Sequence, residues 1–186
     1  HAQLQAKADR AAERLELVVG VVEDSVAALS GNPTFMTALL DSRGRDAYVV
    51  PFLENFHFPV TTRSGLVLCD VHGMRWASTP HAPEDCRADA AAFRRVLADG
   101  RARRELLVTP DGRPTWLIYH GVVFADTGTV EGVVVARVDL GALLQRLPGE
   151  LLLSDVILVR AETAPEDFHG MVAARAFQHS ERRSVD

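Results

Sequence analysis

Arg75, with the aromatic and imidazole side chains of two predicted strands, forms the group in this chain best suited to binding a small molecule. Arg75 and Trp76 stand together in one strand, and Tyr119 and His120 stand together in another. A guanidinium holds a carboxylate through two parallel charge-assisted hydrogen bonds, aromatic rings supply flat apolar walls, and a protonated imidazole donates. These residue types predict a site for an anion or a zwitterion.

Two further residues complete this candidate site: Phe93, on a predicted helix, and His81, which follows the Arg75 strand. Taken one at a time, Phe93, Trp76 and Tyr119 also suit ordinary core positions, and Arg75 can point to solvent from an alternating strand. Both interpretations stay open at the level of sequence.

Catalytic and cofactor motifs are missing from the sequence. It holds no G-x-S-x-G, H-E-x-x-H, Walker A or G-x-G-x-x-G pattern, and its two cysteines form no C-x-x-C. The seven histidines include no pair at i, i+4 spacing that could hold a metal on one helix face. We expect no enzymatic activity, no metal and no cofactor; flavin and haem are disfavoured because no residue pattern marks their attachment.

Composition indicates one substantial core and argues against nucleic acid as a partner. The chain has 186 residues, 47% of them hydrophobic, and a formal net charge of -5. A nucleic-acid binder usually concentrates Lys and Arg on one face. No apolar run approaches the roughly 20 residues of a membrane span. Because the sequence opens on His1 rather than Met, we expect an excised or processed piece.

The first 30 residues predict a long helix. Apolar side chains recur at spacings of three and four along residues 2–29, a heptad-like stripe that can bury against a partner helix or against the chain's own sheet. Shorter helices are expected over 34–40 and 46–55. We divide the chain into this helix (1–30), a core (31–147) and a C-terminal extension or partial membrane-proximal subdomain (148–186). In the last part we expect a strand within 151–159 and at most one helix around Phe168 to Phe177.

The stretch from Cys86 to Leu144 predicts a helix followed by three strands. Apolar residues at helical spacing over 85–99 end at Gly100 and predict a helix of about three turns. Residues 104–108 and 115–124 predict two strands around the Pro- and Gly-containing turn 109–114. A β-branched strand follows over 133–140.

This order resembles the closing half of Cache domains, also called PDC sensors, which are extracytoplasmic PAS-like modules. Their pattern runs roughly D-R-x-x-F-x-x-A-L-x-x-G, a hairpin, then G-x-V-x-x-x-D-L-x-x-L; here it reads Cys86-Arg87, Phe93 to Gly100 and Gly132 to Leu143. Residues 64–78 are similar to the family's first hairpin. The resemblance implies an α+β fold, a PAS-like antiparallel sheet of about five strands with a long N-terminal helix and covering helices.

The resemblance also implies a function. Such domains are the small-molecule-sensing, periplasmic input of a membrane-bound histidine kinase, diguanylate cyclase or chemoreceptor, with flanking transmembrane helices. We expect a carboxylate or an amino acid as the ligand, and a homodimer formed through the N-terminal helix. The alternative is a ligand-free dimerisation or protein-interaction module of a membrane receptor.

Arg75 gains weight from a second resemblance. Residues 73–78 are similar to the G-x-R-Y-S-H of citrate and C4-dicarboxylate sensors, where that Arg binds a ligand carboxylate, although Ser78 replaces the final His. The R-x-W motif of amino-acid-binding Cache domains is absent. In an extracytoplasmic domain a disulfide between Cys69 and Cys86 is permitted, and two buried free thiols are the alternative.

Overall fold

The structure is a computed structural model that describes residues 2–59, 63–109, 113–144, 156–158 and 174–176. The chain divides into two compact units: residues 19–140, which hold the sheet, and residues 1–18 together with 141–186. Helix α1 runs through the division.

Helix α1 spans Ala2–Ser30 and confirms the long helix expected from the heptad-like stripe. It contains no proline, and it ends where Gly31 and Asn32 precede Pro33. In the sheet-bearing unit, its side chains at Val19, Val22 and Val26 are fully buried, so this part of α1 packs against its own chain rather than a partner.

A run of short helices follows α1. Helix α2 (Pro33–Leu40) has Asn32 as its N-cap, whose side-chain oxygen accepts from the Thr34 amide at 2.8 Å, and a proline in its first turn. Then come α3 (Ser42–Gly44), the π-helical turn η1 (Arg45–Val49) and α4 (Val50–Asn55). The helix expected over 46–55 is therefore divided, and its first turn is π-helical.

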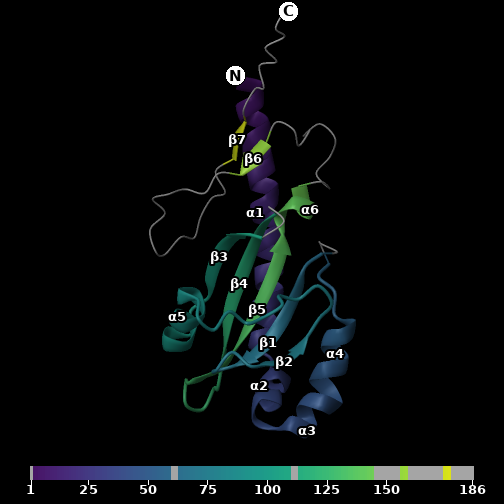
Figure 1. The fold of residues 1–186 in the computed structure, drawn as a ribbon, viewed down its shortest axis with the longest axis vertical. Coiled ribbons are helices and arrows are strands. Elements are labelled where there is room, and N and C mark those ends of the chain that lie inside the picture. The colour runs from purple at the N-terminus through teal and green to yellow at the C-terminus, as the bar shows by residue number, and fades with distance from the viewer. Residues whose placement is uncertain (1, 60–62, 110–112, 145–155, 159–173, 177–186) are drawn as a thin grey trace, which may run out of the picture. The chain divides into compact units, whose positions relative to one another are not determined.

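Five antiparallel strands form the sheet, in the order β2-β1-β5-β4-β3 (Figure 1). They are β1 (Gly65–Asp70), β2 (Arg75–Ser78), β3 (Arg103–Val108), β4 (Pro114–Val123) and β5 (Val130–Asp139). The expected hairpins β1–β2, β3–β4 and β4–β5 are all present. The predicted α+β fold with a sheet of about five strands is confirmed.

Register divides the side chains between two faces. Val67, Val135 and Tyr119 stand side by side across β1, β5 and β4, and the next row along holds Leu68, Val134 and His120. Successive residues of a strand point to opposite faces. We call the face with Val67 and Tyr119 the α5 face, because α5 covers it, and the opposite one the α1 face (Figure 1).

Helix α5 spans Ala91–Asp99 and begins later than the sequence predicted. The expected start at residue 85 is wrong because Cys86 is held in a disulfide and Arg87 has a φ of 46°, outside the helical region. The end is as expected: Gly100 adopts a left-handed φ of 70° and donates its N–H to the Val96 carbonyl at 2.8 Å.

The second unit contributes three short elements to the described residues. Helix α6 (Leu140–Leu144) enters it, and β6 (Val156–Leu158) pairs antiparallel with β7 (Ala174–Ala176). The strand expected within 151–159 is thus found at β6. At 174–176 a strand stands where a helix was expected, and the remainder of that stretch lies outside the described residues. Within the described part of the chain, no helix combines the length and apolarity needed to span a bilayer.

Candidate functional site

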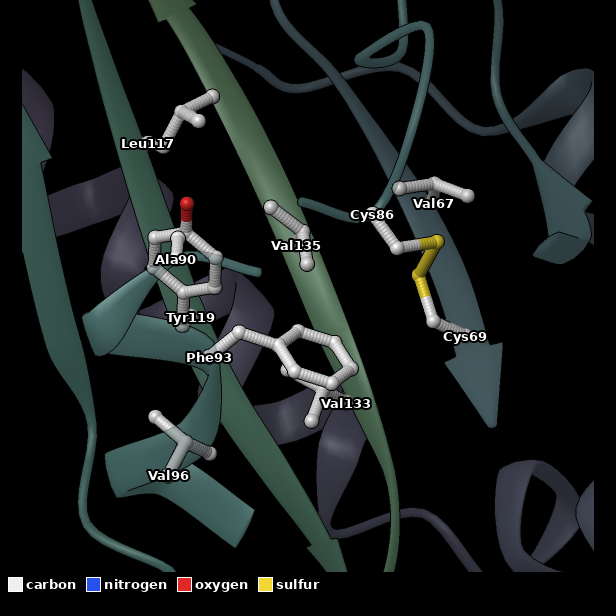
Figure 2. Packing of buried hydrophobic residues seen from close by; sticks show 10 residues of the cluster. All are labelled: Val67, Cys69, Cys86, Ala90, Phe93, Val96, Leu117, Tyr119, Val133 and Val135. Carbon is white, nitrogen blue, oxygen red and sulfur yellow. A yellow bond between two sulfur atoms is a disulfide. The ribbon is translucent and has the colours of Figure 1, made fainter. Parts of the chain in front are cut away.

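The α5 face carries a tightly buried apolar cluster closed by a disulfide (Figure 2). Cys69 of β1 is bonded to Cys86, with 6.3 Å between their Cα atoms, so the open question about the two cysteines is settled in favour of the disulfide. Phe93 lies over Val133 and near Tyr119 in Figure 2. The other buried members are Val67, Ala90, Val96, Leu117 and Val135.

A polar network borders this cluster. The Tyr119 hydroxyl donates to Oε2 of Glu105, on β3, at 2.8 Å, and the Arg87 guanidinium lies 3.5 Å from Oε1 of the same carboxylate. Burial, and then the hydrogen bond to Glu105, raise the pKa of Tyr119 well above its ordinary value. Tyr119 thus stays a hydrogen-bond donor, while the Arg87 and Glu105 side chains keep 36% and 28% of their surface exposed.

The segment of residues 79–90 brings Arg87 to the sheet. It crosses Gly65 so closely that a Cβ there would lie 2.3 Å from the Pro80 carbonyl oxygen, and only glycine leaves that space. The disulfide at Cys86 anchors the other end. Arg87 itself, next in the chain, is one of two described non-glycine residues with positive φ, and such conformations persist only where the surroundings hold them.

Arg137 is a cation without a hydrogen-bonding partner among the described residues. It lies on β5 in one row with Leu117 and Glu105, on the α5 face. Its Nε is buried and donates to no acceptor in the described part of the chain. A guanidinium presents five N–H donors, and leaving buried donors unmade is costly. The described residues therefore supply no acceptor for this buried donor.

Two further ion pairs flank the row. Asp139, only 1% exposed, lies 3.8 Å from Arg113, and Arg103 on β3 contacts Asp99 at 2.5 Å. Glu105 and Asp139 thus each lie beside a guanidinium group.

Solved structures share this arrangement of sheet and helices. The sensor domain of the V. cholerae histidine kinase DctB matches with a TM-score of 0.57 at 19% identity, over 77% of this chain and 58% of its own. An extracellular ligand binding receptor from Desulfohalobium retbaense DSM5692 gives 0.54 at 19% identity, over 77% and 27%. The ligand-binding domain of the Pseudomonas fluorescens chemoreceptor CtaA, in complex with L-isoleucine, gives 0.52 at 15% identity, over 77% and 58%.

The chain has the fold of these solved domains, as its resemblance to Cache domains implies. The resemblance drawn from the Cys86 to Leu144 stretch is confirmed at the level of fold. This chain matches 58%, 27% and 58% of the lengths of the three solved chains. No protein-family model matches the chain, and no curated protein does.

On this fold, two of the six sequence-predicted site residues come together. Phe93 and Tyr119 are both buried in the cluster of the α5 face (Figure 2). Arg75 is exposed at the start of the edge strand β2, where its guanidinium donates to the Ser78 hydroxyl. The two residues compared with the dicarboxylate-sensor motif therefore contact each other. His81 is exposed, with a φ of 60°.

Trp76 and His120 lie apart from the cluster of the α5 face. The Arg45 guanidinium lies 4.5 Å from the Trp76 ring centroid, a cation–π contact with η1. His120 follows Tyr119 directly and so points to the α1 face. There its Nε2 is buried without a hydrogen-bond partner among the described residues, and burial lowers its pKa, opposed by the carboxylate of Glu23 on α1.

Glu23 also joins α1 to the edge of the sheet. Its carboxylate accepts from Nε of Arg104 at 2.6 Å and from a second guanidinium nitrogen of the same residue, a bidentate pair. The Arg104 guanidinium lies 5.7 Å from the Trp116 ring centroid. This contact ties β3 and β4 to the helix.

Sequence reasoning missed Arg87, Glu105 and Arg137. Arg137 had a visible signal: it interrupts a run of five apolar residues in what became a central strand, where a charge is rare. Glu105 and Arg87 gave weaker signals, because an edge strand and a loop tolerate charge. Among the described residues, no group of His, Cys, Asp and Glu side chains is placed to hold a metal ion.

Proposed function

We propose that this chain is the extracytoplasmic, small-molecule-sensing input domain of a membrane-bound signal transducer. The observation that carries the proposal is a Cache fold whose α5 face combines an apolar cluster with the charged side chains of Arg87, Glu105 and Arg137. Small-molecule binding sites typically have a mostly apolar lining with a few convergent polar groups.

We propose Phe93, Tyr119, Arg87 and Arg137 as ligand contacts. The first two supply an apolar wall and a hydroxyl, and the two guanidiniums suit a carboxylate, in a carboxylic acid or an amino acid. The CtaA domain, which was solved with L-isoleucine, supports this class of ligand.

We further propose that the domain works as a homodimer between flanking transmembrane helices, with α1 as the connecting element. Glu23 and Arg104 join α1 to β3, so a displacement of the sheet on ligand binding would reach the helix through a charged contact. The exposed Leu17, with 68% of its surface accessible, marks a face of α1 open to a second helix.

A thermal-shift screen of the purified chain tests the sensing proposal. The panel holds small carboxylates, amino acids and cationic and neutral metabolites of similar size. A ligand at a hundred times its Kd adds about 2.7 kcal/mol of stability, which is readily seen as a raised melting temperature. Dose-dependent stabilisation by one chemical class supports the proposal, and silence across the panel contradicts it.

A second candidate function rests on the packing of the same face. Phe93, Tyr119 and Val133 are at most 1% exposed, so the centre of the face is already filled by the protein's own side chains. This favours a ligand-free dimerisation or protein-interaction module. Association of the chain that is insensitive to every compound in the panel would support this candidate.

A further inference from the structure

We propose that the α5 face selects a small monocarboxylate that lacks an ammonium group, and that Arg137 is its anchor. This inference rests on the proposed sensing function and narrows the ligand class. The observation behind it is that the Arg137 guanidinium has no hydrogen-bonding partner among the described residues.

The charges around Arg137 define the preference. Glu105 lies beside Arg87, Asp139 beside Arg113 and Asp99 beside Arg103, so each of these guanidiniums has a carboxylate near it. Arg137 has no such partner among the described residues. A single carboxylate on the ligand would supply one, and a guanidinium binds it bidentately.

An ammonium group would find no acceptor ready for it. Glu105 accepts from the Tyr119 hydroxyl at 2.8 Å with one oxygen and faces Arg87 with the other. Asp139 is buried beside Arg113. A zwitterion would have to displace one of these guanidiniums or leave its own charge unpaired in a partly buried site, which weakens binding.

The body of the ligand is expected to be apolar. Arg137 has Leu117 beside it in the row, and the next row holds Val67, Val135 and Tyr119. These side chains are at most 3% exposed, and Leu117 stands between Arg137 and Glu105 in the row, so the guanidinium is bordered by hydrocarbon. A short aliphatic chain attached to the carboxylate matches this surface.

Isothermal titration calorimetry with matched compounds tests the proposal on the whole chain. Propionate, isovalerate and isocaproate differ from L-alanine, L-valine and L-leucine only by the ammonium group. We expect at least one of the three carboxylates to bind at least ten-fold more tightly than its amino-acid counterpart. Equal or tighter binding of the amino acid overturns the proposed selectivity.

Substitution of Arg137 tests the anchor. Arg137→Met should weaken carboxylate binding about ten-fold or more, because a charge-assisted hydrogen bond is lost. The unliganded variant should keep or raise its melting temperature, since the guanidinium has no described hydrogen bond to lose; a merely structural arginine would lower it. Arg137→Lys should bind with intermediate affinity, and Arg94→Gln, exposed on α5, should bind like the wild type.

The outcomes separate this inference from the proposed function. Unchanged carboxylate binding in Arg137→Met and Arg137→Lys overturns the anchor. Binding of a cationic or neutral compound with no carboxylate response overturns the ligand class but leaves a sensor domain. No binding by any compound of the wider panel overturns both.

Discussion

Tyr119 shows how one buried hydroxyl can join a core to a charged network. Its ring is fully buried among apolar side chains, and its hydroxyl donates to Glu105. Removal of that donor leaves a partly buried carboxylate oxygen without its partner. Tyr119→Phe should therefore lower the free energy of unfolding by about 1–3 kcal/mol.

Urea denaturation of both tyrosine variants measures this effect. Tyr48, the second of the two tyrosines, is 69% exposed, and Tyr48→Phe is expected to change stability by less than about 0.5 kcal/mol. Equal losses in the two variants would show that the hydrogen bond to Glu105 contributes nothing specific.

His120 gives the folded chain a dependence on acid. Burial lowers its pKa below the ordinary value of about 6.5, so the folded state binds a proton more weakly than the unfolded state does. The free energy of unfolding should consequently fall as pH drops through about 6.5. His120→Gln should reduce this fall.

Denaturation curves at about pH 7.5 and about pH 5.5 test this dependence on either side of the ordinary imidazole pKa. His72→Gln, at an exposed position, serves as the control and should behave like the wild type. A His120→Gln variant that loses as much stability in acid as the wild type would place the sensitive group elsewhere.

For single residues, the sequence indicated which side-chain types belong to the site better than it indicated where each side chain lies on the sheet. Phe93 and Tyr119 were expected at the site and do meet. His120 was expected beside Tyr119, but adjacent strand residues point to opposite faces, which a set of residue types does not reveal. Arg137 was missed because its neighbours Leu117 and Glu105 come from strands whose pairing is known only once the sheet is formed.

The segment of residues 79–90 depends on one glycine. Gly65→Ala would place a methyl group 2.3 Å from the Pro80 carbonyl oxygen and 2.5 Å from the Ala82 nitrogen, so the segment must move or the strand must shift. We expect a loss of about 1–3 kcal/mol. Gly20→Ala is the matched control, because nothing lies within 4 Å of its new Cβ in α1.

The control variant Gly20→Ala is itself expected to change the stability, in the opposite direction. Alanine in place of a helical glycine should stabilise α1 by about 0.5–1 kcal/mol. Thermal denaturation of the two variants should therefore give shifts of opposite sign. Shifts of the same sign would mean that the close approach at Gly65 is relieved without cost.

The disulfide anchors the same segment at its other end. Cys69 and Cys86 are separated by 17 residues, and closing a loop of this size removes about 3 kcal/mol of chain entropy from the unfolded state. Reduction should lower the denaturation midpoint of the wild type accordingly. The double variant Cys69→Ala, Cys86→Ala should be less stable and indifferent to reductant; an identical wild-type midpoint with and without reductant would contradict this.

Elements were predictable where local signals mark both ends. The turn residues at 109–114 and the glycines at 128 and 132 located the strands to within a few residues. The start of α5 was predicted six residues too early, at 85 instead of 91, because helical spacing continues into 85–90 while a tertiary bond at Cys86 prevents the helix. The periodicity of residues 85–90 cannot reveal that Cys86 is bonded to Cys69 on β1.

At the scale of the whole molecule, the proposed dimer depends on which face of α1 is free. Val22 and Val26 of the heptad-like stripe are buried within the chain, as is Leu15, whereas Leu17 is exposed. A second copy would therefore use the Leu17 face. Leu17→Glu should shift the chain toward monomer in sedimentation velocity at matched concentrations.

A matched change keeps this test specific. Leu40→Glu alters another exposed leucine, on α2, and should leave the sedimentation coefficient unchanged. A chain that is monomeric in all three forms would argue against association through α1 in the isolated chain. Association that survives Leu17→Glu would place the interface on another surface.

The strand order has a consequence for how the protein is made. β5 lies in the centre of the five-stranded sheet, paired on one side with β1 and on the other with β4, yet it is the last of the five strands in the chain. During synthesis the β1–β2 and β3–β4 hairpins leave the ribosome first and have no strand to join them. Long-range pairing of this kind slows folding. The nascent domain therefore exposes two open hairpin edges until residues 130–139 emerge, and this is the interval in which a holding chaperone would have most to protect.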